Sequence, residues 1–244
     1  MIAIAPVALE KSAPLSALLG EPVRGVRPLT MEELDKNYGL VWYRARLPAS
    51  GKGALQVGDV RDMALLYQSG RRIGTLDRRR GDTSVELEVQ AGVSLDVQVE
   101  NLGRINYGPR MVDERKGLLG PVRFAGKPVL DWQMHPLPLD DLSALRFTSA
   151  AQAAPAFHRG HFDLEVLGDS FIDLRGWGRG HVWINGHHLG RYWHIGPQQT
   201  LLVPAQWLRH GSNEVIVLEL ETDTPPRRVQ GLANPVFDTP SGAA

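Results

Sequence analysis

The chain has 244 residues and no cysteine, and its 27 Lys and Arg residues balance 27 Asp and Glu residues. The balanced charge excludes the broad positive field that non-specific binding to nucleic acid or to an acidic membrane requires. The lack of cysteine excludes disulfides and thiolate metal sites. At this length we expect two domains of ordinary size, with one large sandwich as the alternative.

The first 30 residues are rich in Ala and Pro, which predicts a lead-in strand followed by a linker. Their apolar start has no basic segment before it and stops at Pro6, and no later uncharged stretch is as long as a membrane helix. We therefore expect a soluble chain that has no signal peptide and binds no membrane. Thr30 and Glu33 then have the spacing of a capping box, which predicts one short helical turn.

Alternation of apolar and polar residues with a period of two is the main local pattern, and it predicts strands with one wet face. It covers residues 41–47, 85–89, 95–99 and 162–166. The runs 182–184 and 215–218 are apolar on both faces, which is typical of strands buried inside a sandwich. A further short turn is expected to begin at Pro204. Because helix signals are few and Gly and Pro recur between the short runs, the predicted fold is all-β.

An internal repeat predicts the architecture. Each copy has an aromatic residue in a strand, then a tight turn ending in Gly, then a second Gly in the next strand. Three equivalent pairs, each 116 positions apart, are Tyr67 and Trp183, Gly70 and Gly186, and Gly74 and Gly190. Two further pairs flank them at offsets of 115 and 119: Tyr43 and His158, and the turn residues Gly92 and Gly211. We conclude that one β-sandwich plan occurs twice.

The repeat and the composition together set the predicted domain boundaries. We expect a lead-in strand and linker at 1–30, a first sandwich at 31–127, a second sandwich at 128–222 and an irregular tail at 223–244. The tail lacks periodicity, so it is expected to be mobile or to lie over the surface.

Several longer motifs in this order resemble the C-terminal half of glycoside hydrolase family 35 β-galactosidases. They cover most of residues 30–221: YGLVWYR (38–44), VENLGRINYG (99–108), KGL (116–118), GWGRGHVWING (176–186), LGRYW (189–193), IGPQQTL (195–201) and VP (203–204). The resemblance implies two tandem galactose-binding-like jelly rolls. In that family these domains follow a (β/α)₈ barrel, which holds a catalytic acid/base Glu and a nucleophilic Glu.

The family's catalytic Glu motifs match no position of this sequence, and a barrel of roughly 250 residues would by itself occupy the whole chain. We therefore expect no catalytic residue here and no enzyme activity from this chain alone. The implied partner is a β-galactosidase catalytic barrel, in the same chain or as a separate one, and the implied role is to buttress it and shape access to galactosides. The alternative is a free-standing galactoside-binding module.

Other candidate sites have plainer explanations. The acidic pairs Glu86/Glu88, Asp140/Asp141 and Glu219/Glu221 fit the wet faces of strands or loop caps, so we expect no independent catalytic pair. Histidines are dense late in the chain, at 181, 187, 188 and 194, but consecutive residues of a turn rarely converge on one ion. We expect no metal site and no cofactor. The basic run at 78–80 is flanked by Asp77 and Asp82, which favours a solvated turn over a nucleic-acid surface.

The candidate site residues form two clusters, which we expect to lie at a substrate rim or an interdomain face. One is Asn101, Arg104, Asn106 and Tyr107, in a polar, Gly-punctuated turn directly after a strand. These side chains either hydrogen-bond the turn and hold the two sandwiches together, or Tyr107 and its neighbours line the rim of the barrel's substrate pocket.

The second cluster is Arg191, Tyr192 and Trp193, which we expect to reach a loop or an interdomain face. Four other tryptophans, at 132, 177, 183 and 207, fit core positions. An exposed apolar patch is expected where the barrel docks, with homodimerisation through that face as a further expectation.

Overall fold

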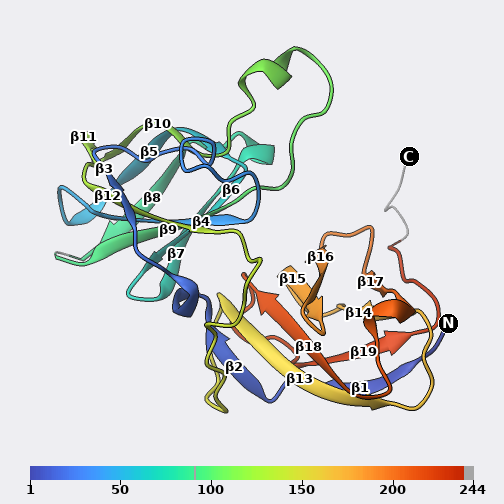
Figure 1. Cartoon of the computed structure of the whole chain (residues 1–244). Helices are drawn as coiled ribbons and strands as arrows, with labels where there is room; N and C mark the ends of the chain where they lie inside the picture. Colours follow the sequence, from blue (N-terminus) through green and yellow to red (C-terminus); the bar gives the residue numbers. More distant parts are fainter. Residues whose placement is uncertain (91, 239–244) are drawn as a thin grey trace. The chain divides into compact units, whose positions relative to one another are not determined.

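The computed structural model describes residues 1–90 and 92–238 and has antiparallel sheets throughout (Figure 1), so the prediction of an all-β fold is confirmed. The chain divides into two compact units. The central unit is Leu19–Asp141, and the terminal unit joins Met1–Leu18 to Leu142–Ala244. None of the helices in the described residues has the length and apolar character needed to span a bilayer.

The central unit contains a six-stranded sheet, in the order β3-β12-β4-β9-β6-β7, and a four-stranded sheet, in the order β11-β10-β5-β8. Its strands are β3 (Val23–Gly25), β4 (Leu40–Arg46), β5 (Gly51–Arg61), β6 (Met63–Gln68), β7 (Arg71–Asp77), β8 (Ser84–Val89), β9 (Ser94–Glu100), β10 (Gly117–Phe124), β11 (Lys127–Pro128) and β12 (Trp132–Leu137). Two 3₁₀ helices accompany them, η2 (Arg78–Arg80) and η3 (Pro109–Asp113).

The terminal unit contains a five-stranded sheet, β16-β15-β18-β13-β2, and a four-stranded sheet, β1-β19-β14-β17. Its strands are β1 (Ile4–Ala8), β2 (Lys11–Pro14), β13 (Ala156–Leu164), β14 (Ser170–Asp173), β15 (Arg179–Ile184), β16 (His187–Trp193), β17 (Thr200–Val203), β18 (Gly211–Glu219) and β19 (Arg228–Leu232). Its 3₁₀ helices are η1 (Leu15–Leu18) and η4 (Ala205–Trp207).

Strand pairing shows the duplicated plan directly. The strand order β4-β9-β6-β7 of the central unit returns as β13-β18-β15-β16 in the terminal unit. One cross-section through these strands joins Tyr43, Val97, Leu66 and Gly74, and its counterpart joins His158, Val217, Val182 and Gly190. The sequence offsets of 115 and 116 therefore align residues that occupy the same place in the two sheets.

The two hairpins of the repeat share their local distortions as well. Ser69 and Gly70 link β6 to β7 with φ of 51° and 76°, and Asn185 and Gly186 link β15 to β16 with φ of 50° and 83°. Positive φ at both central residues defines the hairpin turn whose twist matches that of the flanking strands. Each hairpin also has its pairing irregularity just before the aromatic residue, between Leu66 and Tyr67 and between Val182 and Trp183.

Each unit has its own hydrophobic core, built from the inward residues of its two sheets. In the central unit, Trp132 meets Tyr43 edge-on with ring centroids 6.2 Å apart. In the terminal unit, Trp177 meets Tyr192 in the same way at 6.4 Å. Three of the four tryptophans predicted in the core, at 132, 177 and 183, are buried, whereas the fourth, at 207, is only partly covered.

The predicted boundaries differ from the units at three places. Residues 1–18 include strands, as the predicted lead-in strand implies, but β1 pairs with β19 and β2 with β13, so this segment belongs to the terminal unit. Strand β12 falls within the predicted second sandwich but pairs with β4 of the central unit. Strand β19 falls within the predicted irregular tail but pairs with β14, while the tail beyond residue 238 lies outside the described residues. Each of these pairings joins segments that are distant in sequence, so no local pattern marks it.

The two predicted helical turns are present. The backbone N–H of Thr30 donates to Oε2 of Glu33 at 2.9 Å, and the N–H of Glu33 donates to Oγ1 of Thr30 at 3.3 Å. These reciprocal bonds are those of a capping box. The second turn is η4, which begins directly after Pro204.

Candidate functional site

A loop formed by residues 101–115 leaves the central sandwich between β9 and β10 and carries η3. Three large apolar side chains on it face solvent. Tyr107 is 89% exposed and Val112 is 94% exposed, and Met111 is also exposed. Single exposed apolar residues are ordinary, but three on one loop mark a candidate contact surface.

The predicted polar residues of this loop divide into two groups. Asn101 donates from Nδ2 to the carbonyl of Asn37 at 2.8 Å and accepts from the N–H of Gly103 at 2.9 Å. The Gly103 bond holds the turn itself, and the Asn37 bond ties the turn to the segment before β4 in the same unit. Asn106 and Tyr107 are exposed and have no side-chain partner among the described residues, so these two side chains are open to solvent.

Arg104 links the start of the loop to its end and to a neighbouring segment. Its guanidinium donates to the carbonyl of Glu114 at 3.0 Å and pairs with Oε1 of Glu32 at 2.6 Å. It also donates to the carbonyl of Asn37 at 3.3 Å. Burial opposes ionisation of Glu32, but bonds from the backbone and from Arg104 lower its pKa below the usual value. The loop therefore closes on itself through one side chain.

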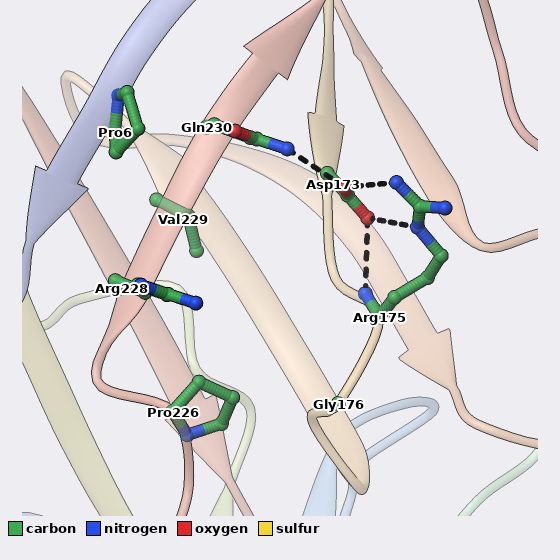
Figure 2. Close-up of a pocket in the computed structure, with 8 residues that line it drawn as sticks. All are labelled: Pro6, Asp173, Arg175, Gly176, Pro226, Arg228, Val229 and Gln230. Carbon is green, nitrogen blue, oxygen red and sulfur yellow. Dashed lines mark hydrogen bonds and ion pairs between the residues drawn. The ribbon is translucent and has the colours of Figure 1, made fainter.

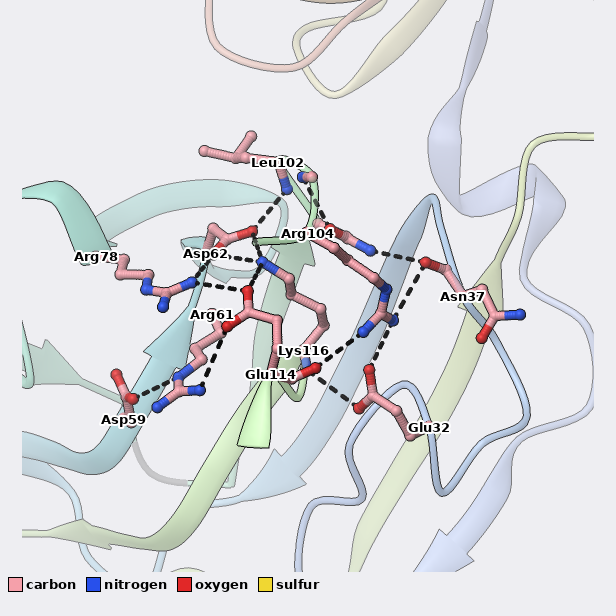
Figure 3. A network of polar contacts seen from close by, with 12 residues as sticks. Glu32, Asn37, Asp59, Arg61, Asp62, Arg78, Leu102, Arg104, Glu114 and Lys116 are labelled. Atoms are coloured by element: carbon pink, nitrogen blue, oxygen red, sulfur yellow. Dashed lines mark hydrogen bonds and ion pairs between the residues drawn. The ribbon is translucent and has the colours of Figure 1, made fainter. Parts of the chain in front are cut away.

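Beneath the loop lies a network of ion pairs centred on Asp62, Glu114 and Lys116 (Figure 3). The ammonium of Lys116 lies 2.7 Å from Oδ2 of Asp62 and 2.8 Å from Oε1 of Glu114. Burial opposes ionisation of Glu114, but Lys116 and Arg78 hold its pKa below the usual value. Sequence reasoning missed this network, because Asp62 follows β5 whereas Glu114 and Lys116 precede β10, and no motif spacing links them.

The second predicted cluster lies in the terminal unit, so the structure does not bring all seven residues onto one element. Tyr192 was expected on a loop or an interdomain face, and that expectation is wrong. It lies within β16 and is buried, and its hydroxyl lies 3.0 Å from both of its possible acceptors, the carbonyl oxygen of Leu218 and Oε2 of Glu219. Burial and the Glu219 carboxylate raise the pKa of Tyr192 well above its usual value. Alternation in β16 points this residue into the core.

The flanking residues of β16 are partly covered. Trp193 has the guanidinium of Arg179 over its ring, 5.3 Å from the centroid, which is within the range of a cation–π contact. Arg191 lies opposite His181 in the register of β15 and β16. Their assignment to a substrate rim remains a prediction.

A cleft of about 460 Å³ in the terminal unit is a second candidate site, and sequence reasoning did not find it (Figure 2). It lies between the end of β14, the start of β19 and β1. Its lining residues are Pro6, Asp173, Arg175, Gly176, Pro226, Arg228, Val229 and Gln230. The volume falls in the range of roughly 300–1,000 Å³ that is usual for small-ligand sites.

The polar groups of the cleft converge on the carboxylate of Asp173. Arg175 donates to both of its oxygens, at 2.9 and 2.7 Å, and the amide of Gln230 donates at 3.2 Å. Burial opposes ionisation of Asp173, but the bonds from Arg175 hold its pKa below the usual value. Arg228 is exposed, and its guanidinium has no partner among the described residues. No sequence pattern marks this site, because Asp173 and Gln230 meet only through the pairing of β14 with β19.

The late histidines and the basic run, which were the remaining candidate sites, contact neighbouring side chains. His181 and His188 are paired, Nδ1 to Nε2 at 3.0 Å, while His187 stacks on Trp207 with ring centroids 4.9 Å apart. In the part of the chain that the structure describes, no three His, Asp or Glu side chains are grouped to hold a metal ion. Each Arg of the basic run 78–80 forms an ion pair with an Asp.

Comparison with known proteins gives two family matches. Residues 28–138 match the model described as "Beta-galactosidase, first all-beta domain", and residues 155–213 match "Beta-galactosidase, galactose-binding domain". The two matches fall within the central and the terminal unit respectively.

Curated relatives agree with the family models. A β-galactosidase of Xanthomonas manihotis is 43% identical over 79% of this chain and 33% of its own length. Human β-galactosidase-1-like protein 2 is 35% identical over 82% of this chain and 33% of its length, and human β-galactosidase is 34% identical over 88% and 36%. The chain thus spans about a third of the relatives it matches. It belongs to the β-galactosidase family, of which it holds two non-catalytic domains, the first all-β domain and the galactose-binding domain.

Proposed function

We propose that this chain buttresses the catalytic barrel of a β-galactosidase and shapes the access of galactosides to it through the 101–115 loop. The observation that carries the proposal is the contrast within this loop. Its base is held by ion pairs and hydrogen bonds, while Tyr107, Met111 and Val112 are exposed at its tip. A fixed base with exposed apolar groups suits a surface that contacts a partner.

The two parts of the tip have different chemistry. Tyr107 offers a flat ring with a hydroxyl, which suits the C–H face of a pyranose and one of its hydroxyl groups. Met111 and Val112 have no polar atoms that hydrogen-bond strongly, so they suit contact with the barrel itself. We therefore assign Tyr107 to the rim of the substrate pocket, and Met111 and Val112 to the docking surface.

The test uses a hybrid enzyme in which this chain replaces the matching region of the Xanthomonas manihotis β-galactosidase. We expect the hybrid to hydrolyse lactose, and we expect Tyr107→Ala to raise KM for lactose by about tenfold with kcat nearly unchanged. A lost aromatic contact of about 1.4 kcal/mol has this effect on binding. Val26→Ala is the control, because Val26 is exposed in the same unit but lies outside the loop.

Two outcomes contradict this proposal. An inactive hybrid is evidence against the buttressing role, since 43% identity should preserve the docking surface. An unchanged KM for Tyr107→Ala removes the rim assignment.

The cleft in the terminal unit favours a second candidate function, a galactoside-binding module. Arg228 and Gln230 provide hydrogen-bonding groups at its wall, and Pro6, Pro226 and Val229 provide apolar surface. Saccharide recognition needs both kinds of group.

Calorimetry of the isolated chain with lactose tests the second candidate. If the cleft binds galactosides, titration with lactose should give saturable heat with a Kd of about 1 mM. The Arg228→Gln variant should bind lactose at least fivefold more weakly. Arg209→Gln, an exposed arginine of the same unit, should bind like the unmodified chain. If no saturable heat appears, the cleft is not a lactose site.

A further inference from the structure

The two ends of the 101–115 loop meet at a single carboxylate. Oδ2 of Asp62 accepts the backbone N–H of Leu102 at 2.8 Å, directly after the loop begins. The same oxygen lies 2.7 Å from the ammonium of Lys116, directly after the loop ends (Figure 3). Asp62 itself lies between β5 and β6, so it belongs to neither end of the loop. One side chain of the sandwich therefore fixes both ends.

The surrounding charges make this junction rigid. Lys116 is 1% exposed, and its ammonium contacts Asp62 through both carboxylate oxygens and also contacts Glu114. Arg78 donates to Oδ1 of Asp62 at 2.7 Å and to Oε1 of Glu114 at 3.2 Å. Arg61 belongs to the same group, because its guanidinium lies 3.8 Å from Oε2 of Glu114 and donates to Oδ2 of Asp59 at 2.7 Å. It also donates to the carbonyl of Asp113 at 2.9 Å. Three cations thus face three carboxylates in this group.

Such a junction is not explained by stability alone. Moving charged groups out of water costs several kcal/mol per ion, and apolar residues of similar volume often hold a fold at least as well. What an ion network adds is a defined geometry, because the planar guanidinium of Arg78 has its donors in fixed directions and the buried ammonium of Lys116 must stay close to both carboxylates. The unit already has an apolar core of its own, so the network's distinctive effect is on the loop it holds.

We propose that Asp62, together with Lys116 and Glu114, positions the 101–115 loop and thereby sets the place of Tyr107 at the substrate rim. The place of Tyr107 at the substrate rim rests on the proposed function of the loop, whereas the positioning of the loop by these three residues does not. Asp62, Lys116 and Glu114 are positioning residues, because they act through the loop and present no atom to a substrate.

The first experiment measures hydrogen exchange in the full chain. Asp62→Leu combined with Lys116→Met replaces one buried pair by apolar side chains of similar size and leaves the pair Arg78 and Glu114. We expect amides of residues 102–115 to exchange at least tenfold faster, while amides of β9 and β10 keep their protection. The control is Lys52→Met with Glu88→Leu, which removes an exposed ion pair of the same unit. Unchanged exchange in the loop overturns the proposal.

A second variant keeps the test decisive if the apolar pair disturbs folding. Asp62→Asn preserves the shape of the side chain and removes only its charge. Its loop amides should also exchange faster, with the melting temperature as the check on the rest of the unit. Loss of protection that spreads evenly over the unit, and not first over the loop, overturns the positioning role.

The second experiment places the same variants in the hybrid enzyme. We expect the Asp62→Leu, Lys116→Met pair to raise KM for lactose about as much as Tyr107→Ala, and adding Tyr107→Ala to it should have little further effect. If Tyr107→Ala raises KM and the apolar pair does not, the positioning proposal is wrong. If Tyr107→Ala itself has no effect, the proposed function of the loop fails, and the exchange experiment still decides whether Asp62 holds the loop.

Discussion

His158 is a buried imidazole that has no hydrogen-bond partner for either ring nitrogen among the described residues. It lies in β13, is 1% exposed and meets the ring of Trp177 edge-on, with centroids 5.6 Å apart. Burial and the charge of Arg227 lower its pKa to about 4. The folded chain therefore holds this histidine neutral over a pH range in which an unfolded histidine becomes charged.

This difference predicts an acid-sensitive terminal unit. The unfolded histidine, with a pKa of about 6.5, binds a proton before the folded one does, so stability is fully present above pH 6.5 and falls as the pH falls toward 4. The loss is on the order of 3 kcal/mol. Denaturant unfolding at several pH values should show a shallower dependence in His158→Phe. The exposed His161, replaced by Phe, is the control, and identical curves for wild type and His158→Phe would contradict the prediction.

Glu219 is a second residue on which the terminal unit depends. Its carboxylate is fully buried and accepts from the backbone N–H groups of residues 178, 179, 221 and 222 and from the hydroxyl of Tyr192. We expect Glu219→Gln to lower the free energy of unfolding by about 3 kcal/mol, because an amide nitrogen would face N–H donors. Glu214→Gln, on a partly exposed side chain, is the matched control. A loss below about 1 kcal/mol would show that the turn tolerates an amide.

At the level of elements, the two equivalent hairpins use different turn residues. Asn and Gly are the preferred pair when both central residues have positive φ, and the terminal unit has them as Asn185 and Gly186. The central unit has Ser69 in the first position with φ of 51°. We expect Ser69→Asn to stabilise the central unit by about 0.5 kcal/mol, because Asn tolerates this backbone conformation better. Gly70→Ala should destabilise it by about 1 kcal/mol. Thermal unfolding measures both, and a lower melting temperature for Ser69→Asn would contradict the argument.

These hairpins also show what the sequence determines locally. Alternation with a period of two and a turn ending in Gly are both contained within about fifteen residues, so the strands and the 116-residue offset were predictable. The pairings of β1 with β19 and of β2 with β13 were not, because each partner is a short segment far away in the sequence. The predicted boundaries near the two ends of the chain differ from the units for this reason, and the one near residue 128 differs because β12 pairs with β4.

The candidate site was likewise predictable from the sequence only in part. The motif around Asn101 and Tyr107 predicted a special loop, since a polar turn directly after a strand needs partners for its side chains. Which side chain does which task was not predictable, because Asn101 bonds to Asn37 and Tyr107 is open to solvent only through the tertiary arrangement. Tyr192 was misplaced for the same reason, since its partner Glu219 lies on β18.

At the level of the whole chain, two units repeat one strand order but carry different surface features. The central unit has the exposed loop and the ion network, while the terminal unit has the cleft at Asp173. The shared part of the plan is the inner strand order of the larger sheet, and the differences lie in the loops that leave it. This division is common, because a rigid sandwich tolerates change in its loops far more readily than in its core.

The chain alone should not hydrolyse galactosides. Retaining hydrolysis needs two carboxyl groups about 5 Å apart across the sugar, one of them kept protonated. Glu86 and Glu88 are exposed on β8, and the carboxylate of Glu219 is fully buried and taken up by backbone N–H donors. Assay of the purified chain on a nitrophenyl galactoside should give no turnover above a heat-killed control. Turnover that copurifies with the chain and is abolished by Glu219→Gln would instead place a catalytic carboxylate in the terminal unit.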